Sequence, residues 1–322
     1  ICSGLVGSEM CIRDSYTAFG GFLAVSWTDL FQGLLMAAAL VAVSVMALGL
    51  DGGIGGAADT VAKRNPALLE LMTDSDGKPL GMLAILSLMA WGLGYFGQPH
   101  ILARFKAVES VELVPRARRI AVSWVFITLV AACLVGFAGI PVFDTPLEDA
   151  EKVFIQLVDL LFHPVVAGIC LAAILAAIMS TADSQLLVSS SAFTGDIYRV
   201  LLRKQASERE LVVVGRLAVL AIALAAFLLA MDPDNRVLDL VSYAWAGFGA
   251  AFGPAVLLSL YWSGMNRWGA LAGILSGGLT VVIWKPLAGG LFDLYEIVPG
   301  FIISAFCIWL VSRVTGGSSV RV

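Results

Sequence analysis

The sequence predicts an all-α polytopic membrane protein, and three observations carry that prediction. The 322 residues are 59% hydrophobic and only 14% charged, whereas soluble domains are about 45–50% apolar and about 25% charged. Eight apolar stretches reach the roughly 20 residues that cross about 30 Å of hydrocarbon. The connections between them carry the glycine, proline and charged residues typical of loops. The predicted spans are 22–50, 81–103, 120–142, 164–186, 211–231, 238–262, 268–290 and 296–314.

The first fifteen residues differ in character from the rest of the chain. Residues 1–15 mix polar and apolar side chains, are too short to span a bilayer, and lack the charged start and cleavage site of a signal peptide. We interpret them as a non-native leader. Residues 16–322 are then expected to be the C-terminal portion of a transmembrane core whose N-terminal spans are missing.

The distribution of basic residues predicts how the spans are oriented. Arginine and lysine are concentrated in the connections 104–119 and 199–216 and recur at Arg267 and Arg313, whereas 51–80 and 143–163 are poorer in them. Because cytoplasmic connections are enriched in lysine and arginine, we expect the first side and the C-terminus to be cytoplasmic. The two long outer connections have room for short surface or re-entrant helices.

A polar cluster follows an apolar run within the fourth span. Ala177, Ser180, Thr181 and Ser184 fall at i, i+3, i+4 and i+7, so they share one helix face. Hydroxyl and carbonyl oxygens are hard ligands that suit a small hard cation. Hydrogen bonding between helices by serine and threonine is the alternative explanation, and the spacing alone does not choose between the two.

An aromatic stripe lies in the second predicted span, among glycines. Trp91, Tyr95 and Pro99 recur at i, i+4 and i+8. Glycine and proline weaken the helical hydrogen-bond ladder and mark a candidate broken helix, beside which aromatic rings can stack on a compact solute. An interfacial aromatic belt with glycines for close packing would give the same pattern.

Two further features are candidates of lower rank. Gly249 and Gly253 form a pair of small residues four apart, which favours tight helix packing and alternatively a gating hinge. Asp29 begins the first span, where a carboxylate either anchors the interface or attracts cations.

Several function classes are excluded or receive no support. The sequence has no P-loop, no G-x-S-x-G and no HExxH motif, so an enzyme is not predicted. Two isolated histidines do not form a metal-binding pattern, and the five cysteines show no paired spacing. We expect no organic cofactor, no nucleic-acid partner and no obligate protein partner.

The motifs together resemble the sodium:solute symporter family. The matching stretches are 20–29, 89–105, 176–187, 240–254 and 294–301, and the similarity runs in order from Tyr16 to the C-terminus. The string Trp-Gly-Leu-Gly-Tyr-Phe-Gly-Gln-Pro at 91–99 resembles in particular the branch that takes up proline.

This resemblance implies a fold, a function and a set of site residues. It implies thirteen spans with an inverted-repeat core of the leucine-transporter type, of which this chain holds about eight, the sixth to the thirteenth. Sodium, the coupling ion, would be bound by the Ala177 carbonyl and by the Ser180 and Thr181 hydroxyls. Trp91, Tyr95 and Pro99 match positions tied to proline binding, and Asp29 matches an acidic position linked to cation coupling.

The resulting expectation is a sodium-coupled secondary transporter that imports L-proline across a bacterial inner membrane by alternating access. The missing early broken helix would supply the other sodium ligands, so the chain by itself is not expected to transport. The alternatives are a symporter for another small solute, a solute-binding membrane sensor and an ion channel.

Overall fold

The computed structural model describes residues 2–106, 108–143, 145, 147–231 and 237–316, with side chains from Ser26 onward. Its elements are helical, as the composition predicts. The chain forms two compact units, each built from two separate parts of the sequence. Unit 1 comprises Ile1–Pro79 and Glu109–Val219, and unit 2 comprises Leu80–Val108 and Leu220–Val322.

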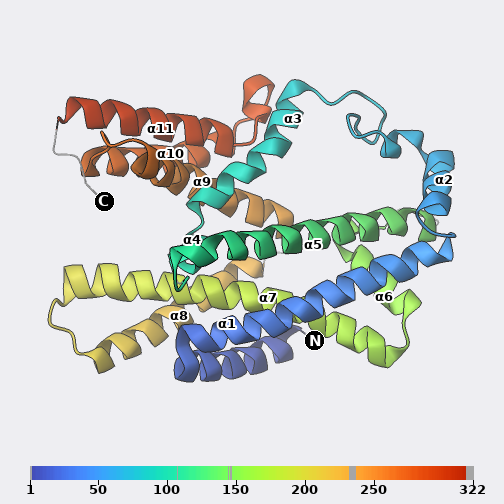
Figure 1. Cartoon of the computed structure of the whole chain (residues 1–322), viewed down its shortest axis with the longest axis horizontal. Coiled ribbons are helices and arrows are strands. Elements are labelled where there is room, and N and C mark those ends of the chain that lie inside the picture. Colours follow the sequence, from blue (N-terminus) through green and yellow to red (C-terminus); the bar gives the residue numbers. More distant parts are fainter. Residues whose placement is uncertain (1, 107, 144, 146, 232–236, 317–322) are drawn as a thin grey trace. The chain divides into compact units, whose positions relative to one another are not determined.

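Unit 1 is a bundle of long helices joined by short ones (Figure 1). Its first helix includes the residues interpreted as a leader, whose side chains lie outside the described part. The predicted short helices of the two long connections are present, at 54–69 and 150–161. Its elements are α1 (Cys2–Leu50), α2 (Ile54–Arg64), η1 (Pro66–Leu69), η3 (Val111–Leu113), α5 (Val114–Val142), η4 (Ala150–Lys152), α6 (Val153–Leu161), α7 (Pro164–Ala192), the π-helical η5 (Phe193–Leu202) and the first half of α8 (Glu208–Ala230).

The core of unit 1 is made mostly of small residues. α1 packs along both α5 and α7, and alanines at 39, 47, 138, 167 and 173 are almost fully buried at these contacts. Small side chains let helix backbones approach closely, which is how helices associate inside a bilayer, where apolar burial gives no driving force. Leu157 and Val158 of α6 complete this core.

One arginine ties the end of α2 to the end of α5. The Arg64 guanidinium donates to the carbonyl oxygens of Ile140 and Phe143, both at 2.6 Å, and to that of Pro141 at 3.2 Å. Ile140 and Pro141 lie in the last turn of α5 and Phe143 caps it, where backbone acceptors have no helical donor. The positive charge also complements the negative end of the helix dipole.

Unit 2 is built around a central helix, α9, which packs against η2, α10 and α11. α10 and α11 lie side by side over most of their length (Figure 1), and both pack on α9. The elements are α3 (Met82–Met89), the 3₁₀-helix η2 (Ala90–Gly97), α4 (Pro99–Lys106), the second half of α8, α9 (Val237–Tyr261), α10 (Arg267–Trp284), η6 (Gly290–Asp293) and α11 (Ile297–Val314).

Glycines of α10 form a buried stripe that was not among the predicted features. Gly269, Gly273 and Gly277 are buried at i, i+4 and i+8. A Cβ atom on Gly269 or Gly273 would come within 2.2 Å of α11, on Ser312 and Ile308 respectively. The sequence contains this stripe as a repeat of glycines four residues apart. The stripe explains why α10 and α11 pack so closely.

The predicted continuous span 81–103 is wrong in one respect, because this segment is not a single α-helix. α3 ends at Met89, η2 follows as a 3₁₀-helix, Gln98 is extended with φ −80° and ψ 113°, and α4 starts at Pro99. Proline favours an extended residue before it and cannot continue the helical ladder. The broken helix that the glycines and Pro99 indicated is therefore confirmed.

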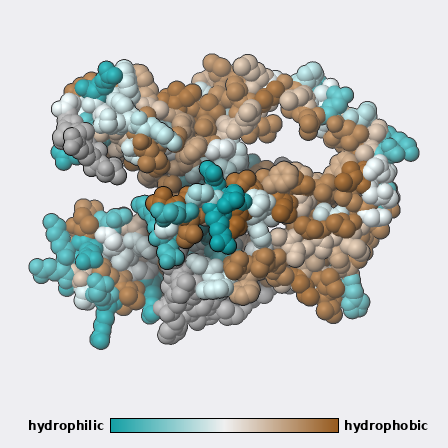
Figure 2. Space-filling model, in the orientation of Figure 1, coloured by the Kyte–Doolittle hydropathy of each residue, from teal (hydrophilic) through white to brown (hydrophobic). Residues whose placement is uncertain are grey.

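Seven helices of the described residues are long and apolar enough to cross a membrane, and Met82–Gly97 is a shorter apolar segment. The predicted end of span 268–290 is wrong, since α10 stops at Trp284 before Pro286 and the left-handed Gly289 and Gly290. Figure 2 shows hydrophobic residues over much of the visible helical surface. In α8 only 6% of the most apolar window is buried within the protein, as expected of a helix that faces lipid.

Candidate functional site

The predicted cation ligands on α7 lie together. The Ser180 hydroxyl donates to the Ala177 carbonyl oxygen at 3.0 Å, and the Thr181 hydroxyl donates to the same oxygen at 3.2 Å. Three oxygens therefore gather on one turn of the helix, where a rotation of either hydroxyl would direct a lone pair outward. Serine and threonine hydroxyls commonly donate such hydrogen bonds to a backbone carbonyl of their own helix. The geometry therefore fits both a cation site and ordinary hydrogen bonding by serine and threonine.

Thr181 is exposed, and two buried polar residues follow it on α7. Asp183 and Ser184 are 2% and 6% exposed, and the Ser184 hydroxyl donates to the Ser180 carbonyl at 2.9 Å. Asp29 is half-buried on α1, which packs along α7 in the same unit. A carboxylate within a membrane helix is costly and is by default a candidate functional residue.

No group of three or more His, Cys, Asp or Glu side chains among the described residues could hold a metal ion. The oxygens gathered on α7 are of another kind, since hydroxyl and carbonyl oxygens suit a hard cation.

The aromatic residues predicted for a solute site form a cluster in unit 2. The ring of Trp91 stacks on Trp245 and on Tyr295, with centroids 5.6 and 6.3 Å apart and interplanar angles of 15°. Tyr95 meets Trp245 edge to face at 4.8 Å and remains 45% exposed. Pro99 begins α4 directly after the break. Trp91 and Tyr95 therefore belong to one ring cluster with Trp245 and Tyr295.

Hydrogen bonds from side chains to backbone carbonyls hold this cluster at the helix break. The Trp245 indole N–H donates to the Trp91 carbonyl oxygen at 2.9 Å, and the buried Gln98 amide donates to the Trp245 carbonyl at 3.4 Å. Gly94 makes the approach possible, since a Cβ there would lie 1.9 Å from the Trp245 indole nitrogen. The helix break leaves backbone carbonyls without a helical donor, and Trp245 of α9 donates to one of them.

Replacing Trp245 with phenylalanine should keep the ring contacts and remove the donor to the Trp91 carbonyl. A net hydrogen bond contributes about 0.5–1.5 kcal/mol, so the midpoint of thermal unfolding of the purified chain should fall by about 2–4 °C per kcal/mol. Trp309→Phe is the matched control, because the Trp309 indole has no hydrogen-bond partner among the described residues. Equal shifts for the two variants would contradict the role given to Trp245.

Three members of this cluster were not predicted individually, namely Gln98, Trp245 and Tyr295. The Tyr295 hydroxyl donates to the Ser242 carbonyl at 2.7 Å, and its backbone N–H donates to the Ser87 hydroxyl at 3.0 Å. Burial, together with the adjacent Glu296 carboxylate, raises the pKa of Tyr295, so its hydroxyl stays protonated and able to donate. The available signal was that all three lie in stretches that resemble the symporter family.

The two glycines considered as a hinge lie in a close-packed, continuous part of α9. A Cβ on Gly249 would be 2.7 Å from the Gly94 Cα, and one on Gly253 would be 2.7 Å from the Phe301 ring. These contacts are those of tight helix packing, and a hinge function for either glycine stays a prediction. The two candidate sites belong to different units, with the α7 oxygens and Asp29 in unit 1 and the aromatic cluster in unit 2.

Comparison with known structures defines the class of fold. The chain superposes on a sodium-coupled sialic acid symporter with a TM-score of 0.69 and 20% sequence identity, over 97% of this chain and 66% of that one. The fold is thus of the leucine-transporter type seen in sodium-coupled symporters, as the resemblance implied. At this identity the match concerns the fold alone.

Residues 6–277 match the family model described as the sodium:solute symporter family, and the chain belongs to that family. It is 49% identical to the high-affinity proline transporter PutP of Bacillus subtilis (strain 168), over 96% of this chain and 64% of the relative. It is 52% identical to the sodium/proline symporter of Escherichia coli (strain K12), over 91% of this chain and 58% of the relative. The chain therefore spans about three fifths of the length of these relatives.

Proposed function

We propose that this chain belongs to a sodium-coupled secondary transporter that imports L-proline by alternating access. The observation that carries the proposal is the identity of about half over nearly the whole chain with transporters that are named for sodium and proline. The aromatic cluster at a helix break supports a compact ring as the solute, since stacked rings and indole or phenol donors recognise apolar rings with polar edges.

For the coupling ion we propose sodium, bound by the Ala177 carbonyl and the Ser180 and Thr181 hydroxyls. Trp91, Tyr95 and Pro99 are proposed to contact the solute, and Asp29 is proposed to contribute to coupling. Sodium binding would raise proline affinity, and by linkage proline would raise sodium affinity to the same extent. Each sodium ion that enters also gains about 2.3 kcal/mol per 100 mV of inside-negative potential.

For the setting we propose a bacterial inner membrane with the C-terminus in the cytoplasm. The support is the excess of basic residues in the connections 104–119 and 199–216. A cysteine introduced at the C-terminus should be protected from a membrane-impermeant reagent in intact cells and should react once the cells are opened. Labelling of intact cells would contradict this orientation.

Uptake measurements test the proposed function. The protein to be tested is a hybrid with the full length of the Bacillus subtilis relative. In it, the part of that relative that this chain does not match is joined to this chain, and we call the hybrid the relative-length transporter. In proteoliposomes it should accumulate labelled L-proline when an inward sodium gradient is imposed, and unlabelled proline should compete better than other amino acids, sugars or small carboxylates. Uptake without saturation would indicate a channel, and binding without accumulation would indicate a sensor.

Replacing Trp91 with alanine in the relative-length transporter is expected to raise the proline concentration for half-maximal uptake about tenfold. Burying an apolar side chain contributes about 1.5–3 kcal/mol, and 1.4 kcal/mol corresponds to a factor of about ten. Trp309→Ala, on the exposed side of α11, is the control that should leave proline affinity unchanged. An unaltered substrate profile for Trp91→Ala would favour the aromatic-belt interpretation.

A further inference from the structure

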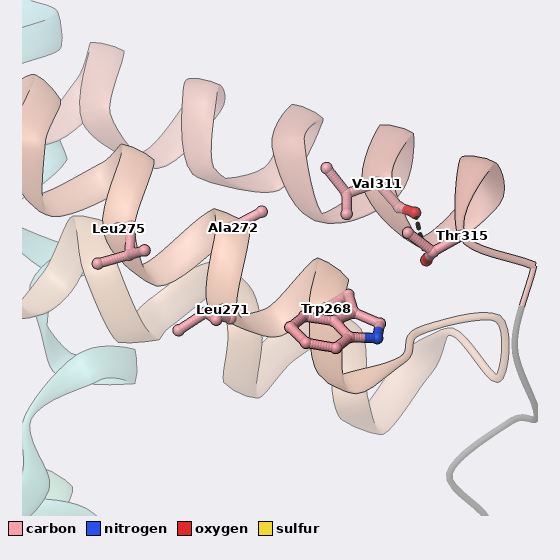
Figure 3. A pocket seen from close by; sticks show the side chains of 6 residues that line it. All are labelled: Trp268, Leu271, Ala272, Leu275, Val311 and Thr315. Atoms are coloured by element: carbon pink, nitrogen blue, oxygen red, sulfur yellow. Dashed lines mark hydrogen bonds between the residues drawn. The ribbon is translucent and has the colours of Figure 1, made fainter.

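A groove runs between α10 and α11 at the end of unit 2 where α10 begins and α11 ends (Figure 3). Its volume is about 570 Å³ and its lining is mostly apolar. The side chains come from one face of each helix, with Trp268 and Leu275 at its two ends (Figure 3). The lining residues are Trp268, Leu271, Ala272, Leu275, Val311 and Thr315.

The groove is open at the outer surface of α10 and α11. Trp268, Leu271 and Leu275 are 51%, 48% and 56% exposed. Because α10 and α11 are both candidate membrane spans, we expect these side chains to face lipid. An apolar hollow of this size in a bilayer is suited to a hydrocarbon chain, whose methylene groups fill it without leaving a void.

The groove has a fixed shape because its floor is cross-linked by polar contacts. Asn266 is 5% exposed, and its side-chain amide donates to the Ser312 carbonyl at 3.2 Å and to the Thr315 hydroxyl at 2.9 Å. Its side-chain oxygen accepts from the Gly269 N–H at 2.9 Å. Ala272 lies among larger lining residues, and its small side chain leaves the space of the groove.

The polar end of the groove carries positive charge. The Arg267 guanidinium lies 5.0 Å from the centroid of the Trp268 ring, which forms the wall at this end. The described carboxylates of unit 2 are Asp239, Asp293 and Glu296, and they lie at the starts of α9 and α11, whereas Arg267 lies where both helices end. The Trp268 indole N–H has no hydrogen-bond partner among the described residues and points toward the polar end (Figure 3).

We propose that this groove binds an anionic phospholipid. An acyl chain would lie along Leu271, Leu275 and Val311, and the phosphate would meet the Arg267 guanidinium and the Trp268 indole N–H. Tryptophan and arginine at a span end are well suited to the headgroup region, and basic pockets between membrane helices bind anionic headgroups.

Native mass spectrometry of the purified chain in detergent tests the proposal, with phosphatidylglycerol and phosphatidylethanolamine added as separate probes. Phosphatidylglycerol should bind more tightly, and Arg267→Gln should weaken its binding about fivefold, since one basic residue near the surface contributes about 1 kcal/mol. Arg313→Gln is the matched control. Arg313 lies at the same end but packs over Trp309, which does not line the groove.

Filling the hollow provides a second, charge-independent test. Ala272→Phe should reduce binding of both lipids, and circular dichroism would establish that the variant is folded. Equal affinity of the chain for the two lipids, or equal losses in Arg267→Gln and Arg313→Gln, would overturn the proposal and leave only non-specific lipid contact. If Ala272→Phe does not fold, the comparison of the two arginine variants still decides.

Discussion

Replacing Gly97 with alanine is expected to destabilise unit 2 strongly, although it adds only one methyl group. A Cβ at this position would lie 2.2 Å from the Phe248 carbonyl oxygen, 2.8 Å from its carbon and 2.9 Å from the Gly249 Cα. All three are backbone atoms of α9, which cannot rotate away as a side chain can. Inserting one methylene into a packed core usually costs about 1–3 kcal/mol, and we expect this site to reach or exceed the upper value.

The measurement is thermal unfolding of the purified chain in detergent, followed by tryptophan fluorescence. Gly92→Ala is the matched control in the same helix, because nothing lies within 4 Å of a Cβ added there, and alanine favours helix over glycine. Gly92→Ala should therefore unfold at the same temperature as the parent chain or slightly above it. Equal stability of Gly97→Ala and Gly92→Ala would show that η2 and α9 do not make this contact.

The same contact explains why the broken helix could be predicted from the sequence while its surroundings could not. Glycines around Pro99 reveal a break locally, since each acts on its own backbone. The partner that fills the space over Gly94 is Trp245, which hydrogen-bonds a residue 154 positions away. No periodicity within one helix contains that information, because it depends on which helices pack together.

Helix ends are harder to predict than the helices themselves. Hydrophobicity continues past Trp284 through Leu287 and Ala288, which is why hydropathy favours a span that reaches residue 290. The chain instead turns at Lys285–Pro286, and Lys285 pairs with the buried Glu296 at 3.4 Å. A charged residue at the end of an apolar run, followed by proline, is the signal that outweighs hydropathy at this position.

The proposed cation ligands on α7 illustrate a different limit of prediction from sequence. The i, i+3, i+4 spacing correctly placed three oxygens on one turn, and the hydrogen bonds at 3.0 and 3.2 Å confirm that they lie together. Spacing could not distinguish an ion site from hydroxyls that only donate to a carbonyl of their own helix, because both arrangements place the residues on one helix face. Only a measurement of ion dependence separates the two.

In the relative-length transporter, Thr181→Val is expected to raise the sodium concentration for half-maximal proline uptake about tenfold or more. A polar contact to a charged group contributes about 1.5–3 kcal/mol, and 1.4 kcal/mol corresponds to a factor of about ten. Ser180→Ala should act in the same direction. Thr181→Ser retains the hydroxyl and should restore most of the sodium affinity, which a purely steric role for the threonine would not predict.

Ser189→Ala is the control on the same helix, since Ser189 is exposed beyond the cluster. It should leave the sodium dependence unchanged, because Ser189 lies about two helical turns beyond Thr181. If Thr181→Val and Ser180→Ala kept the parent sodium dependence while lowering thermal stability, the hydroxyls would be structural, and sodium would have to be bound by other residues. A rise in the sodium requirement at unchanged stability would instead assign them to the ion, since the lost contact would then exist only when sodium is bound.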